Sequence, residues 1–222
     1  MITSGIFSMT LMNLGFWKPV LKINYNMTIT ELYNQLENKD FQDHETGNLF
    51  FPAYMYTYDE EKEYEIDREI LDIKNRLHRP NNYLDVMVID LFEIFCDYLK
   101  QEKFAKSNKF DFYRSNELEK SDAVKKALEK DAYDPRFLEY IHKKIQTHLD
   151  NAGTFEVAYV FVKGFGNAYP YIRASRFMNN FEKYIKGFKL IMFYPGEAKN
   201  YYSLFGLLKD ENLYRAIKLI NA

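Results

Sequence analysis

Apolar residues in this chain fall in two patterns, unbroken runs and helical spacing, and the two patterns alternate along the sequence. The unbroken runs predict strands at Leu49–Tyr58, Tyr83–Ile89, Phe155–Val162, Phe188–Tyr194 and Leu213–Ile220. Helical spacing predicts helices that begin near Thr28, Asp59, Asp90, Phe137 and Pro170. Runs without polar interruption are typical of parallel strands that helices cover on both faces. The chain is therefore predicted to be an α/β protein with a mostly parallel central sheet of the doubly wound, Rossmann-like kind.

Polar residues at the expected ends of these helices support the assignment. Thr28 and Glu31 have the spacing of a capping box, which predicts a short amphipathic helix as an N-terminal extension ahead of the first strand. Asp59 and Asp90 stand where N-caps belong. Pro80 is expected to end the helix that follows Asp59.

Proline and glycine give four further expectations about turns and edges. Pro52 predicts that its strand lies at an edge of the sheet. Pro170 suits the first turn of a helix, and Gly187 suits the residue just after the end of that helix. The pair Pro195–Gly196 is expected to close the strand before it.

The chain is predicted to form one domain, because its 222 residues are within the range of a single core. Met27 opens the first clean helix start, so residues 1–26 are interpreted as an extension and residues 27–222 as the domain. A helical insertion is expected around residues 100–150. Its first part, Lys100–Lys130, has no sustained apolar period and carries nine Lys or Arg against six Asp or Glu. That modest basic bias is more typical of a solvated helical surface than of a nucleic-acid site.

Charge and composition argue against several classes of protein. A formal net charge of -2 removes the electrostatic basis for a nucleic-acid or membrane-surface protein. The uncharged segment Ile2–Trp17 is too short and too mixed to span a bilayer, so no membrane association is expected. The single cysteine, Cys96, is interpreted as a core residue of a cytoplasmic protein. The four histidines lack metal-ligand spacing, and no metal or cofactor is expected.

Ligands of such folds bind beyond the carboxyl ends of the strands, where Asp59, Asp90 and Lys163 are predicted to lie. A nucleotide- or phosphate-binding enzyme with a degenerate site on this face is one hypothesis. The run Val86–Asp90 has the form of a magnesium-holding segment, but the chain contains no GxxxxGK[ST] phosphate loop. N-capping explains both aspartates equally well, and no complete catalytic constellation is found. The chain is therefore not expected to be an enzyme.

Four segments resemble the BrxB family, a core component of BREX (bacteriophage exclusion) defence systems. They are Phe51–Tyr54 leading to Tyr58–Asp59, Val86–Leu91, Val160–Arg176 and Phe193–Gly196. The resemblance runs from about Met27 to Ile220, and residues 1–26 and Lys100–Lys130 depart from it. It implies a role in phage defence, in complex with the alkaline-phosphatase-like PglZ component and beside an ATPase and a DNA methyltransferase. It supplies no catalytic residue.

One of these segments is also the candidate partner-binding surface, since rings and basic side chains alternate along it. These residues are Lys163, Phe165, Tyr169, Tyr171, Arg173 and Arg176. Tyr and Arg dominate interface hot spots, so the segment is predicted to contact a partner protein. The other interpretation is that the rings fill the core while the arginines lie in solvent. Direct nucleic-acid binding through the basic insertion is a third hypothesis, which the near-neutral charge opposes.

Overall fold

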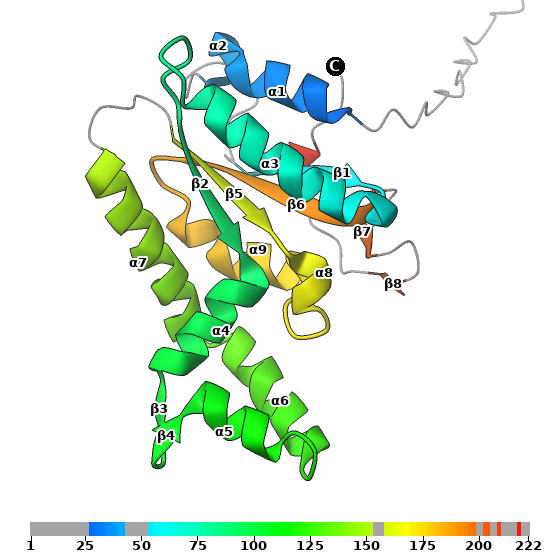
Figure 1. Ribbon diagram of the computed structural model, residues 1–222, viewed down its shortest axis with the longest axis vertical. Coiled ribbons are helices and arrows are strands. Elements are labelled where there is room, and N and C mark those ends of the chain that lie inside the picture. Colours follow the sequence, from blue (N-terminus) through cyan, green and yellow to red (C-terminus); the bar gives the residue numbers. More distant parts are fainter. Residues whose placement is uncertain are drawn as a thin grey trace, which may run out of the picture.

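A parallel sheet forms the centre of the protein (Figure 1). The structure is a computed structural model, and it describes residues 27–42, 53–152, 158–198, 202–204, 208–209 and 217–218. The strand order is β2, β5, β6, β1, β9, and every neighbouring pair is parallel. These strands are β1 (Ala53–Tyr58), β2 (Asp85–Asp90), β5 (Ala158–Lys163), β6 (Lys189–Ala198) and β9 (Ile217–Lys218). The prediction of an α/β fold with a mostly parallel sheet is confirmed.

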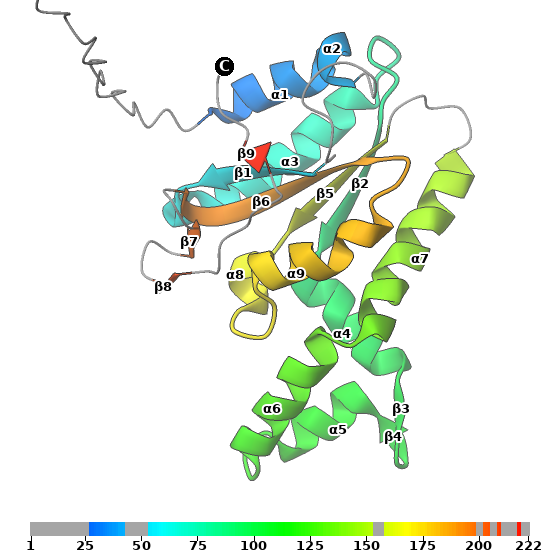
Figure 2. The ribbon, with the colours of Figure 1, turned by 180° about the vertical axis from the view of Figure 1, so that it is seen from behind.

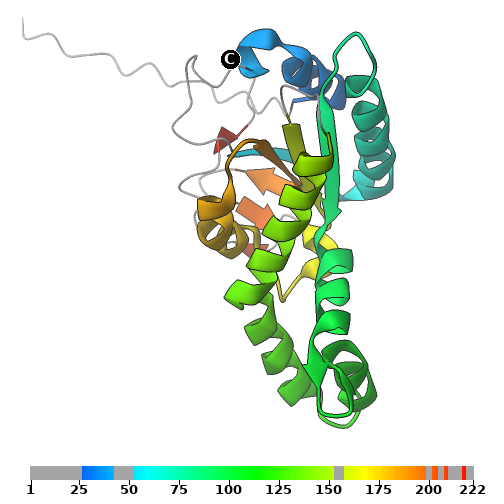
Figure 3. The same ribbon diagram turned by 90° about the vertical axis from the view of Figure 1, so that its left-hand side faces the viewer.

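Helices cover both faces of this sheet, as the side view in Figure 3 shows. One face carries α1 (Ile29–Glu37), α2 (Lys39–Gln42) and α3 (Glu63–Leu77). The other carries α7 (Pro135–Ala152) and α9 (Ala174–Phe181). Two further helices, α4 (Leu91–Gln101) and α8 (Phe165–Ala168), continue from β2 and β5 beyond the carboxyl edge of the sheet (Figure 1). Among the described residues, no helix is both long and apolar enough to cross a membrane.

The unbroken apolar runs arise because each strand sends alternate side chains to two different cores. In β6, Ile191 and Phe193 pack in the core shared with α1 and α3, whereas Leu190 and Met192 pack in the core shared with α7 and α9. All four side chains are fully buried. A strand with both faces buried therefore shows no alternation of polar and apolar residues in the sequence.

The predicted helix caps are confirmed. Thr28 Oγ1 accepts a hydrogen bond from Glu31 N at 3.2 Å, and the Glu31 carboxylate accepts one from Thr28 N at 2.7 Å, which completes the capping box of α1. The Asp59 carboxylate accepts a backbone N–H at the start of the 3-10 turn that leads into α3. The Asp90 carboxylate accepts two backbone N–H groups at the start of α4.

The helix predicted to begin at Pro170 begins four residues later, so this prediction was wrong. The residues after α8 continue in a turn, in which backbone N–H groups of Tyr171 and Ile172 both donate to the carbonyl of Ala168. Pro170 lies within this turn, and α9 starts only at Ala174. Gly187 likewise does not follow α9 directly, because a 3-10 turn (Glu182–Tyr184) comes between them.

The prediction that Pro195–Gly196 closes its strand was also wrong. Pro195 pairs with Tyr58 in the parallel register of β1 and β6, and β6 continues to Ala198. Beyond Pro195 the strand changes partner and pairs with the antiparallel β7 (Tyr202–Leu204), which in turn pairs with β8 (Leu208–Lys209). A proline is tolerated here because it lies at the last position of the β1 pairing, where one missing N–H costs little.

Strand starts differ from the predictions where the backbone turns. β2 begins at Asp85 rather than Tyr83, because Tyr83 has a φ of 53°, which no strand residue adopts. The predicted beginnings of β1 and β5, residues 49–52 with Pro52 and residues 155–157, lie outside the described residues, as does the extension 1–26. The prediction that the Pro52 strand lies at a sheet edge was wrong, because β1 pairs with β6 on one side and with β9 on the other. Of the predicted last strand, Ile217–Lys218 is described, and it pairs with β1.

An arm formed by residues 102–134 projects beyond the carboxyl edge of the sheet (Figures 1 and 2). It contains a two-stranded hairpin, β3 (Lys103–Phe104) with β4 (Ser107–Asn108), followed by α5 (Lys109–Asn116) and α6 (Ser121–Ala132). The two helices bury few apolar side chains. Such a small buried set explains why this stretch shows no sustained apolar period.

Candidate functional site

Two of the three residues predicted at the carboxyl edge lie together. Asp90 and Lys163 end neighbouring strands and are direct partners in the register of β2 and β5. Lys163 Nζ lies 2.8 Å from Asp67 Oδ1, on α3, and 3.4 Å from Asp90 Oδ2. The exposed Asp59 carboxylate instead caps the turn before α3. Asp67, Asp90 and Lys163 are called the carboxyl-edge cluster below.

The cluster is partly shielded from water, and its charges balance each other. Burial lowers the pKa of Lys163, but the hydrogen bond to Asp67 and the charges of Asp67 and Asp90 raise it overall, so the ammonium stays charged. Next to it, the Tyr58 hydroxyl donates a 2.7 Å hydrogen bond to Glu63 Oε2. Burial raises the pKa of the Glu63 carboxyl, and the hydrogen bond from Tyr58 opposes that rise. Lys163 therefore serves as the shared counter-ion of α3 and β2.

Gly164, the residue after Lys163, lets the Asp90 carboxylate lie against the backbone. Its φ is 81°, and a Cβ placed on it would lie 2.7 Å from Asp90 Oδ1. Real Cβ atoms essentially never approach an oxygen that closely, so glycine is required here both by backbone conformation and by contact. The position of Asp90 thus depends on a residue from the next strand.

A left-handed backbone conformation costs a residue with a Cβ roughly 1–2 kcal/mol. Replacing Gly164 with alanine is expected to lower the free energy of unfolding by more than this, because the new Cβ also clashes with Asp90. The matched control is Gly187→Ala, because Gly187 has a similar φ of 77° but open space around its Cβ position. Urea denaturation of both variants separates the contact with Asp90 from the conformational cost. If both variants lose the same free energy of unfolding, the contact with Asp90 does not contribute to stability.

The candidate partner-binding segment divides between core and surface. The Phe165 side chain is 1% exposed and packs against Phe177 and Tyr194, with ring centroids 6.1 Å and 6.0 Å away. Tyr169 and Tyr171 are half-buried and pack on the edge of the same core. The ring of Phe165 therefore belongs to the core of this structure, and the accessible part of the segment lies further along the chain.

Arg173 and Arg176 are held by a tyrosine that the sequence did not single out. The hydroxyl of Tyr133, at the end of α6, accepts a 3.0 Å hydrogen bond from Arg173 N. The Arg176 guanidinium lies over the same ring, 4.5 Å from its centroid. Burial raises the pKa of Tyr133, and both arginines oppose that rise. Tyr133 is 40 residues from Arg173, so no local pattern reveals the contact.

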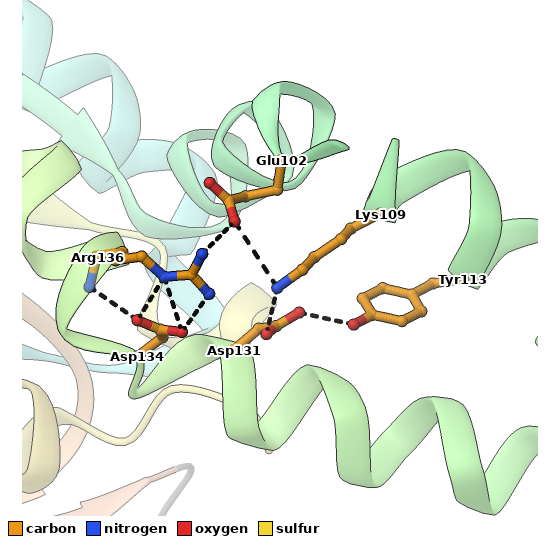
Figure 4. Close-up of polar contacts among 6 residues, drawn as sticks. All are labelled: Glu102, Lys109, Tyr113, Asp131, Asp134 and Arg136. Carbon is orange, nitrogen blue, oxygen red and sulfur yellow. Dashed lines mark hydrogen bonds and ion pairs between the residues drawn. The ribbon is translucent and has the colours of Figure 1, made fainter. Parts of the chain in front are cut away.

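A second polar cluster, also absent from the predictions, holds the base of the arm (Figure 4). Lys109 Nζ lies 2.7 Å from Asp131 Oδ1, and the side chains of this pair are only 11% and 7% exposed. The hydroxyl of Tyr113 donates a 2.7 Å hydrogen bond to the other oxygen of Asp131. This buried pair joins the start of α5 to the end of α6.

The same cluster ties the two ends of the arm together. Arg136, at the start of α7, lies 3.0 Å from Glu102 Oε2 and 2.8 Å from Asp134 Oδ2 (Figure 4). The hydrogen bonds from Arg136 lower the pKa of Asp134. Glu102 begins the arm and Asp134 ends it, so Arg136 contacts both points where the arm leaves the rest of the domain.

Comparisons with known proteins agree on one family. The family model of BrxB, described as BREX protein BrxB, matches residues 87–219, from within β2 to the end of β9. A protein of Bacillus cereus (strain H3081.97), named BREX protein BrxB, is 25% identical over 197 residues, which cover 88% of this chain and 97% of the relative. No solved structure gives a significant match. The matched range includes Lys163, Tyr133, both arginines and the whole arm.

Proposed function

Because this chain belongs to the BrxB family of BREX proteins, we propose that it acts in phage defence as a non-catalytic subunit that binds a partner protein of the same system. The first candidate for this partner is the alkaline-phosphatase-like PglZ component, which the family resemblance implies. The proposed contact surface is the accessible end of the segment predicted from the sequence, Tyr171 to Arg176, together with Tyr133.

The observation that carries this proposal is the arrangement of Arg173 and Arg176 on Tyr133. Arg176 is exposed and Arg173 half-buried, and neither guanidinium forms an ion pair with any residue that the structure describes. The tyrosine ring fixes Arg176, and its hydroxyl fixes the backbone at Arg173. Side chains that are ordered before binding lose less conformational entropy on binding. An oriented guanidinium beside an aromatic ring, with a second arginine three residues away, is a suitable anchor for carboxylates of a partner.

The charged group best placed for phosphate chemistry, Lys163, has a different environment. Its ammonium is already paired with Asp67 and Asp90. A phosphate would have to displace at least one carboxylate, at the cost of an ion pair that is partly buried. This geometry favours a structural role for Lys163, which links α3 to β2 and β5, over a role in binding nucleotides.

Changing both Arg173 and Arg176 to alanine is expected to lower the amount of partner retained by about tenfold or more, because hot-spot arginines carry a large share of interface free energy. The measurement is co-purification of the tagged full-length chain with co-expressed PglZ component, washed at raised salt. The matched control is Arg68→Ala with Arg79→Ala, two exposed arginines near the other face of the sheet.

Far-UV circular dichroism and a melting curve establish that the variants are folded. A folded Arg173→Ala, Arg176→Ala variant that retains the partner as well as the parent chain would remove this surface from the proposal. The alternative, a ligand site at Asp90 and Lys163, predicts instead that Mg²⁺ with ATP raises the melting temperature. Such a rise, lost in a Lys163→Met variant, would contradict a purely non-catalytic binding role.

A further inference from the structure

A pocket of about 350 Å³ lies between α4 and the arm, and it is distinct from the carboxyl-edge cluster. Its walls are mostly apolar and come from α4, α5, α6 and the turn before α9. The lining residues are Phe92, Phe95, Cys96, Leu99, Phe110, Tyr113, Arg114, Glu117, Val124, Leu128 and Tyr171. A pocket of this size is at the lower end of the range in which proteins bind ligands, roughly 300–1,000 Å³.

Large apolar side chains are exposed at this pocket and at a position close to it in the sequence. Phe92 lines it and is 46% exposed, although it is on the helix whose other side fills the core. Leu118, next to the lining residue Glu117, is 97% exposed. Cys96, predicted to be a core residue, is only half-buried and lines the same space. A large apolar side chain that stays exposed beside an apolar pocket, as Phe92 does, is a feature of interaction sites.

The exposed surface of the arm is basic, although the chain as a whole is slightly acidic. Between residues 103 and 130, seven Lys or Arg side chains are exposed against four Asp or Glu. The exposed basic residues are Lys103, Lys106, Arg114, Lys120, Lys125, Lys126 and Lys130. The pocket lining itself holds one basic and one acidic side chain, Arg114 and Glu117, so the positive excess lies on the rest of the arm. Arg114 forms no hydrogen bond or ion pair with any residue that the structure describes. An occupant with negative charge beside its apolar group would complement this surface.

Other occupants fit this surface less well. The chain's own residues 1–26 carry only Lys18 and Lys22 as charged side chains, so their charge has the same sign as that of the arm. A second copy of the chain would have to make a head-to-tail contact between two different surfaces, and such contacts extend into open assemblies unless the geometry closes a ring.

We propose that this pocket, named the arm pocket, receives a bulky apolar side chain carried on an acidic segment of the partner protein. The proposal rests on the proposed function and deepens it. Tyr171 lines the arm pocket and lies two residues before Arg173, so the pocket and the arginine surface form one continuous contact region. The apolar anchor fills the pocket, while Arg114 and the neighbouring lysines pair with the acidic residues around it.

The test is to fill the pocket. Leu128 is half-buried and lines the pocket, and a Leu128→Trp variant of the full-length chain places an indole where the partner's side chain would lie. Retention of the co-purified partner is expected to fall by about tenfold or more, since hot-spot anchors dominate interface free energy. An Arg114→Glu variant is expected to weaken retention most at low salt, where the attraction between exposed charges is largest. The matched control is Leu71→Trp, at a 56% exposed leucine on α3.

Unchanged retention in both folded pocket variants would overturn the arm-pocket proposal and leave the assembly role standing. Failure of the parent chain to retain any partner would overturn the assembly role and the pocket proposal with it. If the chain alone forms an oligomer in size-exclusion chromatography, and Leu128→Trp disperses that oligomer, the occupant is a second copy and the proposed partner segment is wrong.

A measurement without any pocket substitution covers the case in which Leu128→Trp does not fold. Cys96 lines the pocket and is the chain's single cysteine, so its alkylation by N-ethylmaleimide reports on access to the pocket. Peptide mass spectrometry is expected to show several-fold slower alkylation of Cys96 in the complex than in the free chain. Equal rates would overturn the proposal.

Discussion

Replacing Asp131 with alanine is expected to lower the free energy of unfolding by about 3–5 kcal/mol, the usual cost of removing one partner from a buried ion pair. The variant leaves the Lys109 ammonium in an 11% exposed position, where its remaining ion pair among the described residues is with Glu102, 4.0 Å away. It also removes the acceptor of the Tyr113 hydroxyl. Urea denaturation followed by circular dichroism measures the loss.

Two controls make this result specific to the buried pair. Asp97→Ala breaks an exposed ion pair with Lys100, and surface pairs of this kind contribute about 0–1 kcal/mol. A double variant, Lys109→Met with Asp131→Leu, replaces the pair by apolar side chains and is expected to recover most of the lost stability. If Asp131→Ala costs no more than Asp97→Ala, the arm is not held by this pair.

A Phe137→Ala variant is expected to lose about 3–5 kcal/mol, the range observed when a large buried ring is removed from a core. Phe137 is fully buried at the start of α7 and packs against Phe95 and Tyr98 of α4, with ring centroids 5.0 Å and 5.2 Å away. The cavity left by the missing ring would lie where the arm meets the domain, and α4 and α7 would lose the ring contacts of Phe137 with Phe95 and Tyr98.

The control for this variant is Tyr64→Ala, because Tyr64 is 87% exposed on α3 and its removal should change stability by no more than about 0.5 kcal/mol. Denaturant midpoints and slopes of both variants give the comparison. A loss below about 1 kcal/mol for Phe137→Ala would mean that the α4–α7 contact relaxes around the missing ring and does not anchor the arm.

The central sheet could be predicted from the sequence because its signal is local. Strands with both faces buried are apolar along their length, as at residues 158–162, and the caps at Thr28 and Asp90 mark helix starts with short-range hydrogen bonds. The prediction of a helix start was wrong at Pro170, because a proline is compatible with more than one local structure. Pro170 fits a helix start and a bend equally well, and only the packing of the following turn decides between them.

The contacts that define the candidate site could not be predicted in the same way, because they join distant parts of the chain. Asp67 meets Lys163 across 96 residues, and Asp131 meets Lys109 across 22. Each of these side chains looks like an ordinary surface charge in its own segment. Lys163 and Asp90 could be placed side by side because both end parallel strands. The third member of the cluster, Asp67, comes from a helix whose position over the sheet the sequence does not specify.

The salt bridges of Arg136 to Glu102 and Asp134 have an evolutionary consequence. They bring the first and last residues of the arm side by side, so both connections between the arm and the rest of the domain lie at one place. A segment attached in this way can lengthen, shorten or change its surface without any strand of the sheet changing register. Substitutions, insertions and deletions within the arm are therefore expected to accumulate in evolution without loss of the central sheet.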